Sequence, residues 1–195
     1  MRLIVIGSAV LAFATLAGCA GWFGPQGPVV VDYYAGMTDL SGYPKMKVGE
    51  VDSLFDTSGV TKKHPFRPFN VRQCNTQRTE CSLGIVGLTS HVQILSVGES
   101  SAKLKVSFDY KVGDEWRNTV AGGAFVEKLP DLEVILDQGE VSRTAEIPYG
   151  EVRHVELPYG LIFTLCASPP GVSNMDARPC ASQLEVKDYS GAPAF

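Results

Sequence analysis

The segment from Ala102 to Val112 alternates without exception between apolar and polar side chains. Its even-numbered residues are apolar or aromatic, and the residues between them are Lys103, Lys105, Ser107, Asp109 and Lys111. This period of two predicts a β-strand with one buried face and one solvated face, which is typical of an antiparallel sheet.

Several further short runs have strand character and are separated by turn residues. They are Val29–Tyr34, Leu83–Leu88, His91–Val97, Trp116–Val126, Leu132–Leu136, Val152–Leu157, Leu161–Ala167 and Leu184–Tyr189. The 20 glycines and 12 prolines favour short strands over long helices, and Ser53–Phe55 is expected to form at most one helical turn. We therefore predict a single all-β domain over residues 29–195, an immunoglobulin-like antiparallel β-sandwich, with an eight-stranded barrel as the alternative.

The first 18 residues have the pattern of an export signal. Arg2 supplies a positive charge, and the apolar run Leu3–Gly18 is shorter than the about 20 residues that a membrane-spanning helix needs. The run ends in Leu16-Ala17-Gly18-Cys19, which resembles the lipobox of bacterial lipoproteins. The resemblance implies that signal peptidase II removes residues 1–18 and that Cys19 becomes the lipidated first residue.

The resemblance also implies a location. Residue 20 is Ala rather than the Asp that resembles an inner-membrane retention signal, which implies an outer-membrane anchor with the domain in the periplasm. Residues 19–28 are then the lipidated cysteine and a short uncharged tether. The two or three acyl chains of a bacterial lipoprotein hold stably on a membrane, whereas one chain does not. The alternatives are a soluble secreted protein or an uncleaved span with a chance cysteine.

Besides Cys19, the chain contains Cys74, Cys81, Cys166 and Cys180. An even number of cysteines in an exported chain predicts two disulfides. Of the possible pairings we favour Cys74–Cys81 and Cys166–Cys180, because each pair is local and surrounds a turn-rich segment. A metal site is disfavoured, because the sequence has no Cys-x-x-Cys motif and no histidine at ligand spacing.

Residues 61–80 are basic in a chain whose net charge is −4. Pro65 and Pro68 keep this segment out of a helix and favour a stiff, exposed arm or sheet edge. One hypothesis is that it binds an anionic envelope partner, namely a lipid headgroup, a cell-wall polymer or an acidic protein patch. The predicted partner-binding residues are Lys62, Lys63, Phe66, Arg67, Phe69 and Arg72. The alternative is a solvated loop whose two phenylalanines fill the core.

No motif in the sequence predicts catalysis or a cofactor. Ser100-Ser101-Ala102-Lys103 matches the Ser-x-x-Lys of penicillin-recognising enzymes, but the companion motifs of those enzymes are absent. His64, His91 and His154 belong to separate predicted elements. The acidic net charge argues against a nucleic-acid partner. The sequence therefore predicts a non-enzymatic interaction or assembly module of the cell envelope, with an envelope hydrolase or small-ligand binder as the alternative.

The tripeptide Pro-Tyr-Gly occurs at residues 148–150 and again at 158–160. The residues between the two copies have strand character, and a strand of this length spans roughly 23 Å. We therefore predict two similar turns at the two ends of one strand rather than a paired aromatic site.

Overall fold

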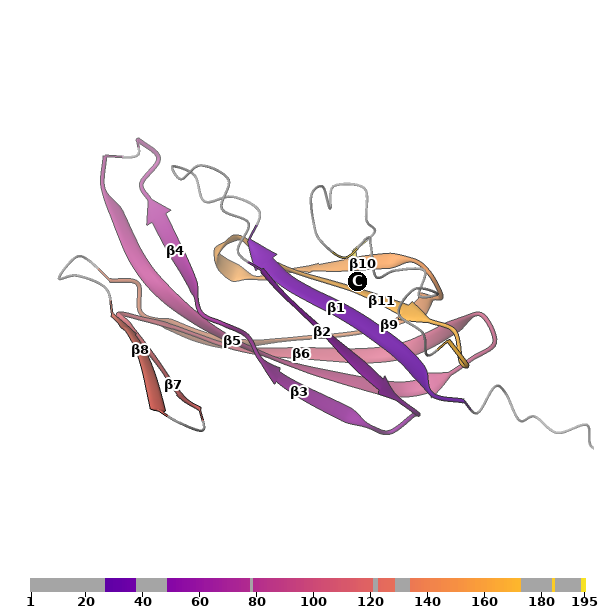
Figure 1. The fold of residues 1–195 in the computed structure, drawn as a ribbon. Coiled ribbons are helices and arrows are strands. Elements are labelled where there is room, and N and C mark those ends of the chain that lie inside the picture. Colours follow the sequence, from indigo (N-terminus) through magenta and orange to yellow (C-terminus); the bar gives the residue numbers. More distant parts are fainter. Residues whose placement is uncertain are drawn as a thin grey trace, which may run out of the picture.

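A computed structural model of the chain describes residues 27–37, 49–77, 79–120, 123–128 and 134–172, together with residues 184, 194 and 195. In these residues the fold is all-β, with two antiparallel sheets that face each other and one separate hairpin (Figure 1). The described part of the chain contains no helix that is long and apolar enough to cross a membrane. The predicted export signal, Cys19 and Cys180 lie outside the described residues.

Sheet A has four strands in the order β10-β11-β1-β2. They are β1 (Val29–Met37), β2 (Gly49–Asp56), β10 (Val152–Glu156) and β11 (Leu161–Ser168). Sheet B has five strands, which are β3 (Thr61–Pro65), β4 (Phe69–Cys74), β5 (Cys81–Val97), β6 (Ser101–Gly113) and β9 (Asp137–Pro148). β3 and β4 both pair with β5 at one edge, and β9 pairs with β6 at the other. The separate hairpin joins β7 (Glu115–Val120) to β8 (Gly123–Lys128).

The hydrophobic core lies between the sheets and is built from the inward-facing residues of both. The alternation predicted for residues 102–112 is confirmed, because β6 buries Leu104, Val106 and Phe108 completely and exposes the lysines between its buried residues. Phe108 packs edge to face on Phe163 of β11, with ring centroids 4.7 Å apart. Each such side chain removed from water contributes about 1.5–3 kcal/mol to folding.

The all-β, antiparallel prediction is confirmed, and the described strands form two separate sheets rather than one closed barrel. Two predicted strands, Leu83–Leu88 and His91–Val97, are one continuous strand, β5. The polar residues between them do not end it, because Ser90 is fully buried opposite Phe108 of β6 and continues the ladder.

Three strands of the structure, β2, β3 and β9, lack a visible apolar alternation. The helical turn expected at Ser53–Phe55 is wrong, since these residues lie in β2 and pair with Val30–Asp32 of β1. β2 and β3 place charged or titratable residues at their inward positions, and β9 is exposed at half of its positions. Side chains alternate between the two faces in all three strands, but the apolar residues do not follow this alternation.

Three predicted strands near loops differ from the structure. In Leu132–Leu136, Val134 makes a single bridge to Leu83 and Leu136 is 78% exposed, so the described residues of this run form no strand. The single strand predicted at Trp116–Val126 is instead the β7–β8 hairpin. Of the run Leu184–Tyr189 only Leu184 is described.

Sheet A is covered on both faces at β11. All positions of β11 are buried, although only its odd-numbered residues belong to the core between the sheets. On the other face Leu184 packs with Cys166, and Thr164 Oγ1 donates a hydrogen bond to Leu184 O at 3.2 Å. At β10, Ala194 forms a parallel bridge with His154, and Phe195 N donates to His154 O at 2.8 Å.

The two Pro-Tyr-Gly turns flank β10, as predicted. In the first turn, Tyr149 OH donates to Gly98 O at 3.0 Å. The second turn is a 3-10 turn, η1 (Pro158–Gly160), in which Tyr159 has a φ of 64°. Its hydroxyl donates to Asp137 Oδ2 at 2.5 Å. Each tyrosine therefore fastens one end of β10 to sheet B.

Candidate interaction surface

The basic segment forms one edge of sheet B. β3 pairs with residues 89–93 of β5, and β4 pairs with residues 81–86. Between the two strands, Phe66 N donates to Leu88 O at 2.9 Å. The segment therefore follows β5 along most of its length as an extended sheet edge.

The two phenylalanines of this segment belong to the core. Phe66 is 2% exposed and Phe69 is 1% exposed. The Phe66 ring packs edge to face against Phe163 of the opposite sheet, with centroids 6.3 Å apart. Both side chains are therefore closed to a partner, and these two predicted contact residues are not part of the exposed surface.

The four predicted cations do not share one environment. Lys63, Arg67 and Arg72 are exposed along the edge. Lys62 points inward instead, and its Nζ lies 2.8 Å from Oδ1 and 2.6 Å from Oδ2 of Asp52. The exposed row therefore consists of three cations, and the fourth, Lys62, pairs with Asp52 where β2 of sheet A meets β3 of sheet B.

The joint between β2 and β3 is a charged cluster made by Tyr33, Glu50, Asp52, Lys62 and His64. Asp52 accepts a hydrogen bond from Tyr33 OH at 2.8 Å, and its Oδ2 lies 2.9 Å from His64 Nδ1. Glu50 accepts a hydrogen bond from the backbone N of Arg67 at 3.0 Å, and its Oε1 lies 3.7 Å from His64 Nε2. Inward-pointing charges of this kind protect sheet edges from further pairing.

The cluster shifts the pKa values of two of its members. Burial alone would raise the pKa of Asp52, but hydrogen bonds from Lys62 and Tyr33 outweigh burial and hold that pKa below its usual value. Burial, together with the neighbouring Asp52 carboxylate, raises the pKa of Tyr33. Asp52 is therefore the carboxylate around which this joint is organised.

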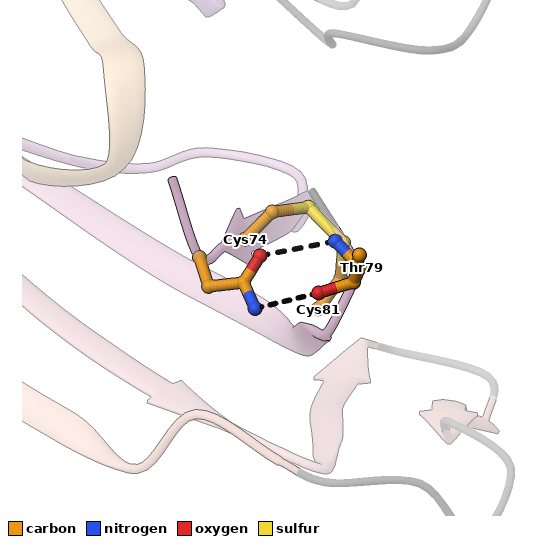
Figure 2. Close-up of a disulfide and its surroundings, with 4 residues drawn as sticks. Cys74, Thr79 and Cys81 are labelled. Atoms are coloured by element: carbon orange, nitrogen blue, oxygen red, sulfur yellow. Dashed lines mark hydrogen bonds between the residues drawn. A yellow bond between two sulfur atoms is a disulfide. The ribbon is translucent and has the colours of Figure 1, made fainter. Parts of the chain in front are cut away.

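A disulfide closes the far end of the basic edge, as predicted for Cys74 and Cys81 (Figure 2). The two Cα atoms are 4.0 Å apart in a directly opposed pair of β4 and β5. Within the loop, Asn75 Nδ2 donates to Thr79 Oγ1 at 2.9 Å, and Thr79 N donates to Asn75 Oδ1 at 3.0 Å. For the second predicted pair, Cys166 is fully buried in β11 and Cys180 lies outside the described residues.

The outer face of sheet B carries a polar hollow. Its lining residues are Thr61, His91, Gln93, Lys105, Ser107, Asp109 and Glu140. His91 Nε2 lies 2.9 Å from Asp109 Oδ2, and Ser107 stands directly opposite His91 in the β5–β6 ladder. The hollow thus brings a hydroxyl, an imidazole and a carboxylate to one side of the sheet.

Asp137, at the start of β9, joins Tyr159 to Tyr110. It accepts hydrogen bonds from both hydroxyls, at 2.5 Å and 3.3 Å respectively. The hydrogen bond to Asp137, with burial, raises the pKa of Tyr159 to about 12. The same bond from Tyr159 is the main cause that holds the pKa of Asp137 below its usual value.

The charged cluster has one signal in the sequence, which is the spacing of its charged residue types rather than a hydrophobic pattern. Glu50 and Asp52 are two residues apart in β2, and Lys62 and His64 are two residues apart in β3. Acidic residues at a period of two on one strand and basic residue types at the same period on the next, joined by a short turn, indicate facing edges. Among the described residues no group of three or more His, Cys, Asp or Glu side chains is placed to hold a metal ion.

No protein-family model, curated protein or solved structure matches this chain.

Proposed function

We propose that the chain is a bacterial cell-envelope lipoprotein, anchored to the outer membrane through Cys19. Its domain, an immunoglobulin-like β-sandwich on the periplasmic side, binds an anionic envelope partner through the basic edge of sheet B. The activity is non-enzymatic recognition or assembly. The Leu16-Ala17-Gly18-Cys19 motif supports the anchor, and the facing sheets with one shared core support the sandwich.

The observation that carries the proposed binding activity is the row formed by Lys63, Arg67 and Arg72. All three are exposed on one sheet edge, while the two phenylalanines between them are buried. At about 3.3 Å per strand residue, the row is roughly 30 Å long. A row of cations raises the local concentration of an anionic partner and steers its approach.

The anchor would set the direction of this edge. Residues 20–28 lie between Cys19 and β1, and fully extended they span roughly 30 Å. Val29, the first residue of β1, pairs with Asp56 at the end of β2, close to where β3 begins. The basic edge would therefore start near the membrane and end at the disulfide tip on the opposite side of the molecule (Figure 1).

The binding test reverses the three exposed cations in one full-length chain, as Lys63→Glu, Arg67→Glu and Arg72→Glu. This variant should lose cosedimentation with phosphatidylglycerol-containing vesicles or with purified peptidoglycan, whichever the wild type binds. Wild-type binding should weaken as salt rises, because exposed charges are screened over about 10 Å at 0.1 M salt. A wild type that binds neither material contradicts both of these partner chemistries.

The matched control makes the same change of net charge on another surface. Lys103, Lys105 and Lys111 are exposed on the outer face of β6, and changing all three to Glu should leave binding unchanged. Equal loss in both variants would mean that net charge, and not the edge, governs binding.

The anchor has its own test. In Cys19→Ser cells, labelling with a radioactive fatty acid should disappear and the unprocessed precursor should accumulate. Cys74→Ser serves as the control, because it removes a cysteine from the domain and should leave labelling intact. Persistent labelling of the Cys19→Ser chain would falsify the lipobox interpretation.

A second candidate function, a hydrolase or small-ligand binder, is favoured by the polar hollow on sheet B. There Ser107, His91 and Asp109 are the residue types of an acyl-transfer site, with the His91–Asp109 contact at 2.9 Å. Ester hydrolysis by the wild type that His91→Ala abolishes would support this candidate. His64→Ala, in the charged cluster, would be the control histidine.

A further inference from the structure

Two facing sheets present four edges, and side chains or terminal residues cover two of them. At the β2 edge, Lys62 Nζ from β3 donates to the backbone O of Ser53 at 2.7 Å. At the β10 edge, Ala194 and Phe195 add to the ladder through His154. Both edges of sheet A are therefore engaged by other parts of the same chain.

Prolines interrupt the β3–β4 edge of sheet B at the end of β3 and in the link to β4. Phe66 N and Val60 O bond to β5, so the backbone groups of the alternate residues, Lys63 and Pro65, face the free edge. Pro65 has no N–H to offer there, and Pro68 between the two strands removes a second donor. Natural sheets use edge prolines to prevent pairing with another strand.

The fourth edge, β9, has none of these protections in the described part of the chain. β9 pairs with β6 over all 12 of its residues, from Asp137 to Pro148, without a register shift. Its single proline stands at its last position. β9 is thus a long, regular edge strand with continuous backbone donors.

The register shows which backbone groups are open. Tyr149 N donates to Ser100 O at 3.0 Å, which extends the β6–β9 register by one residue. Backbone groups of alternate residues face the same neighbour in an antiparallel pair. The odd-numbered residues of β9 therefore face β6, and the N–H and C=O groups of Glu140, Ser142, Thr144 and Glu146 face the free edge.

The side chains of β9 restrict what could pair there. Glu140 and Glu146 are exposed on the outer face of sheet B, six positions apart. On the inner face, Val141 and Ala145 pack against the core but are only partly buried. An added strand would cover these two apolar side chains and oppose the two carboxylates, and opposite charges on facing strands stabilise pairing.

We infer that β9 accepts an added β-strand from another protein, an extended segment with basic residues six apart on one face and apolar residues on the other. In this mode of recognition, main-chain hydrogen bonds supply affinity and alternate side chains supply specificity. A second copy of β9 is the poorer occupant. Its only basic residue is Arg143, so β9 of a second copy cannot place a basic residue opposite both Glu140 and Glu146. This surface lies at the opposite edge of sheet B from the basic row, so neither proposal depends on the other.

The test uses the full-length chain in detergent and the fluorescent heptapeptide Lys-Val-Thr-Val-Thr-Val-Lys. Wild type should bind this peptide saturably in fluorescence anisotropy. Thr144→Pro removes one N–H from the free edge while sparing the β6 ladder, a position that edge strands tolerate, and should lower affinity about tenfold or more. Thr144→Ala keeps the N–H and should bind within about twofold of wild type.

A second variant keeps the inference testable if Thr144→Pro fails to fold. Glu140→Lys with Glu146→Lys should reverse the preference, so that the peptide Glu-Val-Thr-Val-Thr-Val-Glu binds better than the lysine peptide. A folded Thr144→Pro chain that binds the lysine peptide as wild type does would overturn strand addition. So would an absence of saturable binding by the wild type. Wild-type self-association that Thr144→Pro abolishes would assign the edge to a second copy and overturn the foreign partner.

Discussion

β11 of sheet A and β6 of sheet B are both interior strands of their sheets, yet their burial differs. β11 is buried at every position, whereas β6 alternates between buried and exposed residues. The difference arises on the faces that point away from the shared core. On that face of β11, Leu184, Tyr34 and Val152 pack against Cys166, whereas that face of β6 is exposed at its lysines.

The difference between β11 and β6 teaches that the spacing of apolar residues in a strand indicates whether one or both of its faces are covered. The outer face of β11 holds Ile162, Thr164, Cys166 and Ser168, which are all nearly or fully buried. Thr164 satisfies its hydroxyl through Leu184 O. A strand covered on both faces has a near-continuous run of apolar residues, whereas a strand covered on one face alternates between apolar and polar residues.

The largest expected effect is loss of the core that both sheets share. Phe163 stacks on Tyr33 with centroids 5.5 Å apart and packs edge to face on Phe108. Phe163→Ala should therefore cost about 3–5 kcal/mol of unfolding free energy, measured by urea denaturation. Ser142→Ala, at an exposed position of β9, is the control and should change stability by less than about 0.5 kcal/mol.

The comparison itself is tested by truncating one residue on the outer face of each strand. Ile162 of β11 is 3% exposed, so Ile162→Ala should cost about 2–5 kcal/mol by urea denaturation. Lys105 of β6 is exposed, and Lys105→Ala should change stability by less than about 0.5 kcal/mol. Equal and small effects at both positions would contradict a covering layer on sheet A.

The disulfide should contribute next, at the far end of sheet B. Replacing Cys74 and Cys81 together by serine removes a loop constraint worth about 2.5 kcal/mol in the chain-entropy estimate. Reductant should lower the denaturation midpoint of the wild type by an amount that matches this loss. In the variant, reductant should no longer cause this part of the decrease. A wild-type midpoint insensitive to complete reduction would refute the contribution.

The smallest expected effect is a pH dependence at the joint between the sheets. The pKa of Asp52 is lowered in the folded state, so its contribution is present above the unfolded pKa of about 3.9. That contribution is lost as pH falls through the still lower folded pKa. A partly exposed pair of this kind contributes about 0–1 kcal/mol.

Asp52→Asn should therefore flatten the fall in stability below about pH 4, measured by urea denaturation across pH 3 to 7. Asp56→Asn, at the end of the same strand, is the matched control. An unchanged acid limb in Asp52→Asn would place the acid sensitivity elsewhere.

Strands could be predicted from the sequence where the hydrophobic effect alone determines which residues are apolar. Residues 102–112 were predicted correctly, because apolar side chains face the core and charged ones face water. β2 and β3 were missed, because Asp52 and Lys62 pair with each other inside the joint and so stand at positions that usually hold apolar residues. β9 was missed because half of its residues are exposed at the edge of the sheet, so it contains few apolar residues.

The candidate surface was likewise predictable only in part. The charge of Lys63, Arg67 and Arg72 was visible in the sequence, and their exposure follows from their outward positions. Phe66 could be assigned to core or surface only once the register of β3 on β5 was known, because a one-residue shift exchanges the two faces of a strand. The open backbone groups of β9 carry no side-chain signature at all, so only the ladder reveals them.

The pairing of β1 with β11 also determines when the molecule can fold. These are the first and last strands of the described chain, and Val30 lies opposite Ser168. At a synthesis rate of about 5–20 residues per second, β11 emerges on the order of 10 s after β1. During that interval β1 lacks one of its two neighbours, and pairing over such a sequence distance is itself slow. Sheet A therefore stays incomplete until β11 has been synthesised.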